Sequence, residues 1–469
     1  MRYFALATDY DGTLASQGLV DDATVRALSR FVASGRRLVL VTGRQVDELE
    51  DVFPHLELFE RIVAENGAVL FTPSSREVRA LEPPPNPAFI TALRARGVQP
   101  LAVGHVIVAT CEPHETTVLD VIRTMGLELH VEFNKGSVMV LPAGVTKGTG
   151  LAAALLELGL SQHNVVGVGD AENDHALLAL SECGVSVANA LASLKDRSDW
   201  ISSAAHGAGV SELIDRVLDD DLRSGAPARR RIPVGRSADG QALSLEPYGG
   251  SVMITGSSRP ARAAIGAALF ERLRDAHYQL CVVDTDGAHY ELPTGAFFGS
   301  EEHAPAIQDM ARSLADPRRS AVANLAAVPL EGRPSWFAAL LSSLLELRAR
   351  AGRPHWIVAD EGHQLLPRHA EARQDGLPKR IGELLLLSAK PALVSSDVLA
   401  EIDTVIAAGP EAEESLREFA HASGRSVPEL PDAAGGSLVW TTNERRALSV
   451  DVTPRRAQPA AEREKRLPG

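Results

Sequence analysis

The first 220 residues alternate short apolar runs with longer stretches in which apolar residues recur every three or four positions. The short runs end at polar residues or glycine and predict buried strands at residues 4–8, 37–41, 61–64 and 165–168. The longer stretches predict helices at residues 22–34, 45–52 and 147–158. Because strands that alternate with helices build parallel sheets covered on both faces, we expect an α/β core here.

A proline-rich segment, residues 82–87, interrupts this alternation. The residues after it, up to residue 139, predict a small α+β insert with strands at 103–110 and 137–141. The insert divides the predicted core into residues 1–81 and 140–222.

A second boundary lies at residues 223–245, which are charged, contain Gly and Pro, and show no periodicity, so they predict a linker. The alternation then resumes and predicts a second α/β domain at residues 246–453, followed by a flexible tail at 454–469. The strands expected in this domain are residues 251–255, 279–284, 320–325, 355–359, 392–395 and 404–408.

The composition is that of a globular protein and argues against a membrane protein or a disulfide-rich protein. Of 469 residues, 45% are hydrophobic and 23% charged, which is ordinary for a globular chain of several domains. No apolar run approaches the roughly 18 residues of a membrane helix, and an acidic pair, Asp9 and Asp11, precedes any apolar signal segment. The three cysteines are too few and too widely spaced for a disulfide framework or a zinc site. We expect a cytoplasmic protein without a membrane partner.

The net charge of -14 is uneven along the chain. Residues 1–222 carry 17 Lys and Arg against 30 Asp and Glu, whereas the remaining residues are nearly balanced. Nucleic-acid binding requires a basic surface that neutralises phosphates, so this distribution argues against a nucleic-acid partner.

Polar segments follow the predicted strands, at the sheet edge where open α/β sheets place their ligands. The first, D-Y-D-G-T (residues 9–13), sets Asp9 and Asp11 two residues apart, so that both carboxylates face one side in extended chain. One carboxylate can attack phosphorus as a nucleophile, and the other can act as general acid and base. By itself, such a segment is also typical of a simple turn.

Two further segments supply groups for phosphoryl oxygens. V-T-G-R (residues 41–44) offers the hydroxyl of Thr42 and a backbone N–H at a helix entry. T-K-G (residues 146–148) opens a predicted helix with the positive charge of Lys147.

The fourth segment, G-D-A-E-N-D (residues 169–174), contains two hard oxygen ligands, Asp170 and Asp174. Mg²⁺ prefers such carboxylates together with phosphate and water oxygens. Each segment is common by itself, but all four in this order predict one phosphoryl-transfer site.

These four segments resemble the motifs of the haloacid dehalogenase (HAD) superfamily phosphatases, over residues 1 to about 220. I-V-A-E-N-G-A (residues 62–68) and the position of the insert resemble type IIB members, whose small α+β cap would here be residues 82–139. The resemblance implies a Rossmann-like core and an activity similar to that of archaeal-type phosphoglycolate phosphatases and sucrose-phosphate phosphatases.

The resemblance also implies catalytic roles by position. Asp9 would be the nucleophile that carries an aspartyl-phosphate, and Asp11 the general acid and base. Thr42 and Lys147 would bind the transferred phosphoryl group.

Substrate-binding and metal-binding roles follow from the same resemblance. The substrate's phosphate would be bound by Thr42, Gly43, Arg44 and Asn173. Mg²⁺ would be held by Asp9, the backbone carbonyl of Asp11, Asp170 and, as support, Asp174.

Candidate residues for substrate selection lie in the predicted cap: His105, Glu132, Asn134 and Lys135. The alternative interpretation is that these residues form only a solvated rim.

The second domain contains an altered phosphate-loop segment, residues 256–263. A working loop reads G-x-x-x-x-G-K-[ST], but after Gly256 its last three positions here are Ala, Arg262 and Ala. Asp360 and Glu361 follow an apolar strand, as in a Walker B segment. These residues resemble a degenerate P-loop ATPase of the HerA/FtsK group over about 246–425, and imply nucleotide binding or a scaffold role in place of ATP hydrolysis.

A D-T-D-G segment at residues 284–287 imitates the first phosphatase motif. Alanine stands at position 288, where the motif has threonine, and no later motif follows it. We interpret this segment as a turn at a strand end.

Three hypotheses follow. The first is a Mg²⁺-dependent phosphomonoesterase for a small phosphorylated metabolite, such as phosphoglycolate or a sugar phosphate. The second is an ATP-driven, translocase-like protein in which the first half regulates. The third is a sensor in which the first half binds a phosphorylated ligand.

Overall fold

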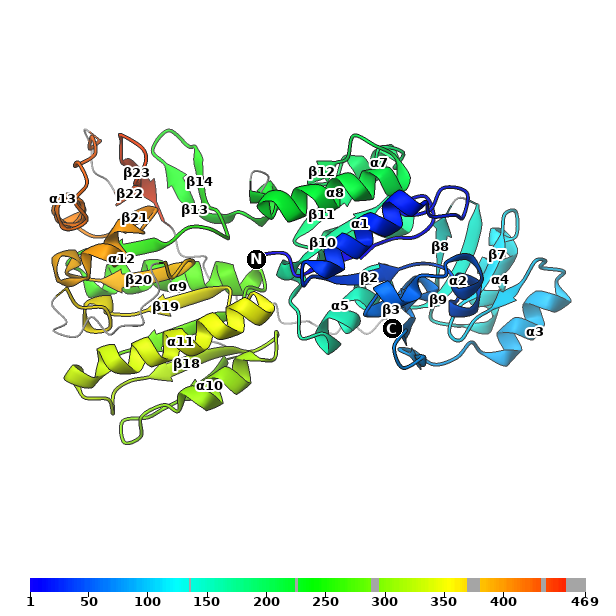
Figure 1. Ribbon diagram of the computed structural model, residues 1–469, viewed down its shortest axis with the longest axis horizontal. Helices are drawn as coiled ribbons and strands as arrows, with labels where there is room; N and C mark the ends of the chain where they lie inside the picture. The colour runs from blue at the N-terminus through cyan, green and yellow to red at the C-terminus, as the bar shows by residue number, and fades with distance from the viewer. Residues whose placement is uncertain (135, 224–226, 288–294, 369–379, 432–435, 453–469) are drawn as a thin grey trace, which may run out of the picture. The chain divides into compact units, whose positions relative to one another are not determined.

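A computed structural model describes residues 1–134, 136–223, 227–287, 295–368, 380–431 and 436–452. The chain divides into two compact units (Figure 1). The first unit is Met1–Arg230 together with Ala349–Gly352, and the second unit is Arg231–Arg348 together with Arg353–Gly469.

The first unit is built on a sheet of eight strands in the order β12-β11-β10-β1-β2-β3-β4-β5. From β12 to β3 neighbouring strands are parallel, and β4 and β5 extend the sheet antiparallel. The strands are β1 (Ala5–Thr8), β2 (Arg37–Val41), β3 (Arg61–Ala64), β4 (Val69–Thr72), β5 (Glu77–Ala80), β10 (Val165–Gly169), β11 (Cys183–Ser186) and β12 (Trp200–Ile201).

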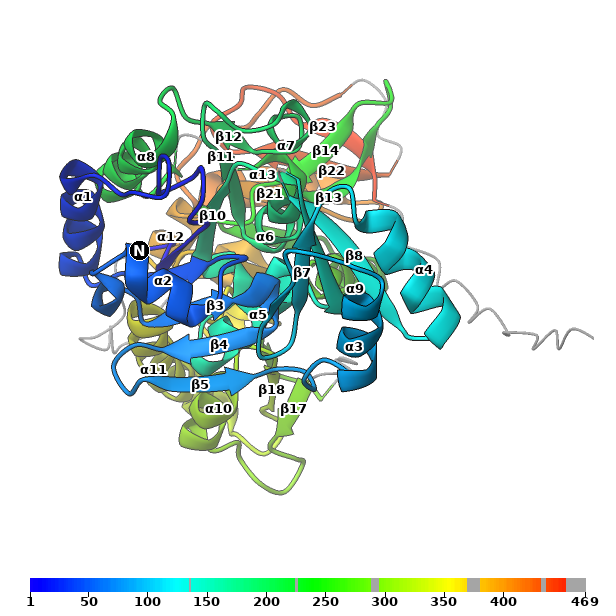
Figure 2. The ribbon, with the colours of Figure 1, turned by 90° about the vertical axis from the view of Figure 1, so that its right-hand side faces the viewer.

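Helices cover this sheet on both faces. Helices α1 and α8 lie side by side on one face, and α5 and α6 are neighbours on the other (Figures 1 and 2). The helices of the core are α1 (Asp22–Ala33), α2 (Val46–Val52), α5 (Lys147–Glu157), α6 (His175–Leu180), α7 (Ala192–Lys195) and α8 (His206–Asp220). Its 3₁₀ turns are η1 (Leu56–Leu58), η2 (Glu65–Gly67), η3 (Gln162–Asn164) and η4 (Glu172–Asp174).

The strands and helices predicted for this core are confirmed to within a few residues at each end. The central strands are buried on both faces, which is why they read as continuous apolar runs. The predicted strands pair in parallel as expected, but the sheet continues at one edge with two strands that were not predicted, β4 and β5, which pair antiparallel. Every residue of β5 is exposed, so its sequence carries no hydrophobic signal.

Residues 82–142 contain a separate four-stranded antiparallel sheet, the cap sheet, in the order β6-β7-β9-β8 (Figure 2). Its strands are β6 (Ala102–Val103), β7 (Val108–Cys111), β8 (Leu129–Asn134) and β9 (Ser137–Pro142), and its helices are α3 (Pro87–Ala95) and α4 (Glu115–Met125). The strand predicted over 103–110 is instead two short strands, because the intervening residues turn back toward the core. The predicted strand 137–141 is confirmed as β9.

The second unit has an eleven-stranded sheet in the order β14-β13-β23-β22-β21-β15-β20-β19-β16-β18-β17. Strands β15 to β21 are parallel, and the other four form an antiparallel extension. The strands are β13 (Ile232–Ser237), β14 (Ala242–Leu245), β15 (Val252–Thr255), β16 (Leu280–Asp284), β17 (Gly295–Phe298), β18 (Ser320–Asn324), β19 (Trp356–Ala359), β20 (Leu384–Ser388), β21 (Thr404–Ala407), β22 (Ser437–Thr441) and β23 (Leu448–Asp451).

The helices of the second unit are α9 (Arg259–Asp275), α10 (Ile307–Leu314), α11 (Arg333–Ala351), α12 (Ser396–Ala400) and α13 (Ala412–Ala422). Short 3₁₀ turns are η6 (Ala228–Arg230), at the end of the first unit, and η7 (Leu330–Gly332), η8 (Gly362–Gln364) and η9 (Pro391–Leu393). No helix among the described residues is long and apolar enough to span a membrane.

Five of the six strands predicted for the second unit are confirmed. The strand predicted at 392–395 is wrong: Pro391 starts η9 there, and the buried strand is β20, a few residues earlier. The expected linker contains the hairpin β13–β14, whose alternation is obscured by a register shift between Pro233 and Gly235. The predicted tail, 454–469, lies outside the described residues.

Candidate active site

The carboxyl ends of β1 and β10 and the first turn of α5 place three charged side chains together. Asp9 directly follows β1, and its backbone N–H donates to the carbonyl of Val168 at 3.0 Å, which continues the pairing of β1 with β10. Lys147 is the first residue of α5, and the side chain of Thr146 caps that helix. The predicted nucleophile and the predicted phosphate-binding lysine are therefore neighbours.

Lys147 bridges two carboxylates. Its Nζ donates to Oδ1 of Asp9 and to Oδ1 of Asp174, each at 2.6 Å. All three side chains are buried, and that of Lys147 is only 1% exposed. A buried ion triplet of this kind is stable only while every member keeps its partner.

Asp174 also organises the turn after β10. Its Oδ2 accepts the backbone N–H groups of Asp170 at 2.8 Å and Ala171 at 2.9 Å. A Cβ at Gly169 would lie 2.5 Å from Cβ and Cγ of Asp174, so only glycine permits this approach. Asp170, in turn, accepts the hydroxyl of Thr13 at 3.1 Å, which ties the fourth segment to the first.

Asp9, Asp170 and Asp174 form a buried acidic cluster whose ligand atoms all lie within 4.8 Å of one another. Three carboxylates this close repel one another, and a cation would offset that repulsion. Their hard oxygens are the donors that Mg²⁺ prefers, so the residues present fit the ion that the resemblance implies. The carboxylate of Asp11 is not part of this cluster.

The charges of the site shift its pKa values. Burial, together with the nearby Asp174 carboxylate, raises the pKa of Asp9 to about 7, although Lys147 acts in the opposite direction. Burial by itself would lower the pKa of Lys147, but the Asp174 and Asp9 carboxylates outweigh it and hold that pKa above its ordinary value. Lys147 is therefore positively charged at neutral pH, whereas the charge of Asp9 depends on the balance between its burial, the Asp174 carboxylate and the Lys147 ammonium.

The second segment lies beside this cluster at the end of β2. Thr42 is fully buried, and its Oγ1 accepts the backbone N–H of Arg44 at 3.1 Å. Arg44 binds Asp11 through two bonds, Nε to Oδ2 at 2.6 Å and Nη2 to Oδ1 at 2.7 Å. The predicted general acid is therefore held, in this structure, by a predicted substrate-binding residue.

A chain of amides joins the site to the cap. Asn173 donates through Nδ2 to Oδ1 of Asn66 at 2.9 Å, and Asn66 donates to the carboxylate of Glu132 on β8. Sequence reasoning did not single out Asn66. The available signal was the E-N-G sequence, because Asn tolerates the left-handed conformation (φ 57°) that it adopts here.

Glu65, the neighbour of Asn66, was also not predicted from the sequence as a functional residue. Its fully buried carboxylate accepts the backbone N–H groups of His105 at 2.7 Å, Val106 at 2.9 Å and Ile107 at 3.0 Å. The core thereby holds the loop between β6 and β7. Of the predicted cap residues, His105 contacts Glu65 and Glu132 contacts Asn66. Lys135 lies outside the described residues.

Comparison with known proteins bears on this half of the chain. Residues 6–85 and 121–214 match the family model described as haloacid dehalogenase-like hydrolase. All of these residues belong to the first unit, and they include each of the four motifs. The first unit is a haloacid dehalogenase-like hydrolase. We call it the hydrolase unit below.

Individual relatives match a similar share of this chain. Phosphoglycolate phosphatase 2 of Saccharolobus solfataricus is 26% identical over 227 residues, which are 46% of this chain and 93% of that protein. The phosphoglycolate phosphatase of Methanothermobacter thermautotrophicus is 28% identical over 224 residues, 46% of this chain and 98% of that protein. A crystal structure of a haloacid dehalogenase-like hydrolase from Bacteroides thetaiotaomicron is 22% identical, with a TM-score of 0.41, and covers 46% of this chain and 100% of that chain.

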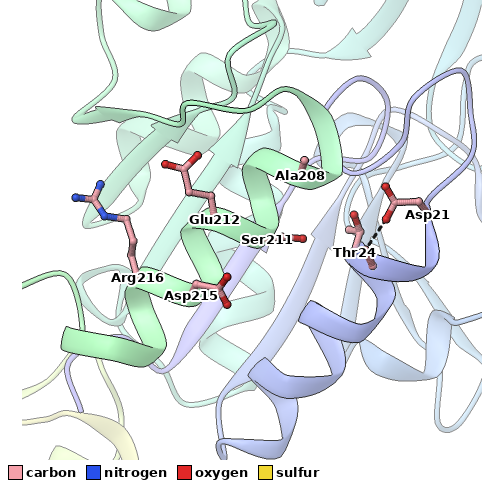
Figure 3. Close-up of a pocket in the computed structure, with 8 residues that line it drawn as sticks. Asp21, Thr24, Ala208, Ser211, Glu212, Asp215 and Arg216 are labelled. Atoms are coloured by element: carbon pink, nitrogen blue, oxygen red, sulfur yellow. Dashed lines mark hydrogen bonds between the residues drawn. The ribbon is translucent and has the colours of Figure 1, made fainter.

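A hollow of about 700 Å³ on the hydrolase unit lies away from the motifs (Figure 3). It lies between the start of α1 and α8. Its lining residues are Asp21, Ala23, Thr24, Ala208, Ser211, Glu212, Asp215 and Arg216. None of them belongs to a motif, so the chemistry of the hydrolase unit is not placed there.

The residues predicted for nucleotide binding in the second unit do not form a phosphate-cradling loop. Helix α9 already begins at Arg259, with Ser258 as its cap and Pro260 in its first turn, so most of the expected loop is helical. Arg262 donates to the carbonyl of Gly256 at 2.6 Å and to Glu361 at 2.7 Å. The prediction of a P-loop domain is therefore not supported, although the unit is α/β as expected.

Two other predicted features of the second unit, the Walker B-like segment and the D-T-D-G segment, each contain a carboxylate that accepts hydrogen bonds from nearby backbone N–H groups. Asp360 precedes Glu361 at the end of β19 and accepts its backbone N–H at 2.9 Å. Asp284, in the D-T-D-G segment, accepts the N–H groups of Asp286 at 3.1 Å and Gly287 at 2.9 Å. That segment is the strand-end turn that we expected.

Proposed function

We propose that the hydrolase unit is a Mg²⁺-dependent phosphomonoesterase that acts on a small phosphorylated metabolite through an aspartyl-phosphate on Asp9. The observation that carries this proposal is the buried cluster of Asp9, Asp170 and Asp174 with Lys147 bound inside it. The relatives named phosphoglycolate phosphatases support a small phosphate ester as the substrate. A cytoplasmic location is part of the same proposal.

In the first step, a carboxylate oxygen of Asp9 attacks phosphorus, and the bond between phosphorus and the leaving oxygen breaks. Asp11, in its protonated form, gives its proton to that oxygen, which departs as an alcohol. Both carboxylate oxygens of Asp11 are bound to Arg44 in this structure, so Asp11 must leave Arg44 before it can reach the leaving oxygen.

In the second step, water attacks phosphorus, and its proton passes to the Asp11 carboxylate. The bond between phosphorus and Asp9 breaks, which releases inorganic phosphate and restores the aspartate. Lys147 and the hydroxyl of Thr42 bind the phosphoryl oxygens in both steps, and the fixed ammonium stabilises the charge that develops on them.

Asp9, the backbone carbonyl of Asp11, and Asp170 would hold Mg²⁺, with Asp174 as support. The ion would supply Lewis-acid stabilisation of the phosphoryl oxygens. Gly43, Arg44 and Asn173 would border the bound phosphate.

The test is Mg²⁺-dependent release of phosphate by the full-length protein from p-nitrophenyl phosphate and from a panel of sugar and acid phosphates. Asp9→Asn should lower the rate at least ~10³-fold, because the nucleophile is lost. The exposed Asp47→Asn makes the same chemical change on α2 and should leave the rate within about twofold. Acid-quenched wild-type protein should carry one phosphoryl group on the peptide that contains Asp9. Equal activity of wild type and Asp9→Asn would refute the proposal.

For the second unit we propose a scaffold role without ATP hydrolysis. Arg262 is engaged with Glu361 and with the Gly256 carbonyl, and residue 263 is alanine, so the hydroxyl that would ligate magnesium is missing. The full-length protein should therefore show no ATP turnover and no saturable ATP binding by calorimetry. ATP binding would favour a regulatory, nucleotide-binding unit, and ATP turnover stimulated by DNA would favour the translocase-like alternative.

A further inference from the structure

The two faces of the cap sheet have different surroundings. Helices α3 and α4 pack on one face, where Val131 of β8 lies against the buried cluster that includes Phe89 and Val118. Residues two apart on a strand face the same side. His130, Glu132 and Asn134 therefore lie together on the other face of β8.

That second face meets the active site. Glu132 accepts a hydrogen bond from Asn66, which also binds Asn173 of the fourth motif. Met139, which pairs with Glu132 across the strands, has its sulfur 3.6 Å from the position that a Cβ on Gly43 would occupy. The row His130, Glu132 and Asn134 thus faces the part of the site where the remainder of a phosphate ester would extend.

Two side chains of this polar row each have a buried polar atom. Nδ1 of His130 and Oδ1 of Asn134 are buried and have no hydrogen-bond partner among the described residues. Unpaired buried polar atoms are rare in folded proteins and call for an explanation. Burial also raises the pKa of Glu132 to about 7, against the opposing effect of Lys147, which agrees with its position close to Lys147 and Asp174.

On the basis of the proposed phosphatase function, we propose that His130, Glu132 and Asn134 form a binding site for hydroxyl groups, so that the substrate is the phosphate ester of a sugar or polyol. A hydroxyl donates to a carboxylate or amide oxygen, and it can donate to or accept from either tautomer of an imidazole nitrogen. Glycolate phosphate presents a carboxylate instead. That group only accepts hydrogen bonds, so it has no proton to donate to Oδ1 of Asn134 or to the carboxylate oxygens of Glu132.

The first experiment compares kcat/KM of the full-length protein, with Mg²⁺, for glucose 6-phosphate, sorbitol 6-phosphate, phosphoglycolate and p-nitrophenyl phosphate. We expect at least one of the two hydroxyl-rich esters to exceed phosphoglycolate by ~100-fold or more, because a site built to bind hydroxyls rejects ligands that lack them. A preference for phosphoglycolate over both hydroxyl-rich esters would overturn the inference and leave the phosphatase function standing. No hydrolysis of any ester, p-nitrophenyl phosphate included, would overturn the phosphatase function itself and the inference with it.

The second experiment changes the row. Glu132→Lys should lower the ratio of kcat/KM for the preferred hydroxyl-rich ester to that for phosphoglycolate by at least ~100-fold, since a cation replaces the acceptor. Asn134→Leu should lower the ratio of the hydroxyl-rich ester to p-nitrophenyl phosphate by ~10-fold or more. Glu128→Gln, at an exposed position just before β8, is the control and should change neither ratio. Unchanged ratios in folded Glu132→Lys and Asn134→Leu, judged by unaltered circular dichroism, would overturn the inference.

Discussion

Lys147 is the residue on which the charge balance of the active site depends. It is the ammonium that lies between the buried carboxylates of Asp9 and Asp174. Two like charges in a buried site disfavour each other's ionisation, and the lysine offsets this repulsion, although its own burial costs hydration free energy. The side chain that we propose as a phosphate-binding group is therefore also one on which the stability of the site depends.

Replacing Lys147 by Met should destabilise the hydrolase unit by about 3–5 kcal/mol at pH 7, because two buried carboxylates lose their cation. The free energy of unfolding, from urea denaturation followed by circular dichroism, measures this change. Lys195→Met is the control: that lysine is only partly buried and donates to one carbonyl, of Ala188, so we expect a loss of about 1 kcal/mol or less. Equal losses in the two variants would contradict the role given to Lys147.

Glu182 provides a separate, pH-dependent test of buried charge at the residue scale. Burial favours its neutral form, but His163, at 2.7 Å, together with Arg2 and Arg230, outweighs burial and lowers the pKa of Glu182 to about 2. Because this pKa is lower in the folded than in the unfolded protein, ionised Glu182 stabilises the fold above pH 4.5. That contribution is lost as the pH falls from about 4.5 to about 2.

Glu182→Gln should therefore cost on the order of 3 kcal/mol at pH 7, and the difference from wild type should shrink steadily below pH 4.5. Urea denaturation of both proteins at several pH values from 7 down to 3 gives the difference directly. A difference that stays constant over this range would show that ionisation of Glu182 does not stabilise the fold.

At the scale of elements, the turn η2 positions several parts of the site at once. Glu65 and Asn66 both adopt left-handed conformations, and they direct one side chain to the loop between β6 and β7 and the other to Asn173 and Glu132. The last residue of η2, Gly67, lies against the start of α5. One turn thus connects the core sheet, the cap sheet and the helix that carries Lys147.

Gly67→Ala tests this close packing. Gly67 has φ +108°, and a Cβ there would lie 2.0 Å from the carbonyl oxygen of Thr146, so alanine must displace the start of α5. We expect a loss of roughly 3 kcal/mol or more in unfolding free energy and a large loss of hydrolysis. Gly35→Ala is the matched control, since Gly35 also has positive φ (+83°) but no atom within 4 Å of its Cβ position. It should cost only about 1–2 kcal/mol and retain activity. Full activity of Gly67→Ala would contradict the proposed coupling of η2 to α5.

At the scale of the whole molecule, all the residues that we propose for catalysis lie in one unit. The four motifs and the cap sheet lie in the first unit, and the family match ends at residue 214. The relatives named above align over 93% and 98% of their own length with less than half of this chain. A polypeptide the size of the hydrolase unit is therefore a complete protein in those relatives.

We expect a fragment of residues 1–230 to fold and to retain Mg²⁺-dependent phosphate release within about threefold of the full-length kcat/KM. The measurement is the same phosphate-release assay on both proteins, with circular dichroism to verify folding. A folded fragment without activity would show that the second unit completes the site, and would contradict the placement of catalysis in the hydrolase unit alone.

The order of the core elements and the four catalytic motifs could be predicted from the sequence for a local reason. A strand buried on both faces is a continuous apolar run, and the polar residues that follow it, such as Asp9 and Asp170, stand out at its end. The exposed strand β5 and the bulged hairpin β13–β14 lack that signal, since neither presents a regular apolar face.

What the amino-acid sequence determined by itself was the succession of strands and helices and the chemical identity of the groups at the strand ends. The tertiary structure alone decided which of those groups touch: that Arg44 binds Asp11, that Asn66 joins Asn173 to Glu132, and that Arg262 binds Glu361. The physical reason is that local periodicity depends on neighbours along the chain. Contacts between residues 33 to 107 positions apart depend instead on how separate elements pack.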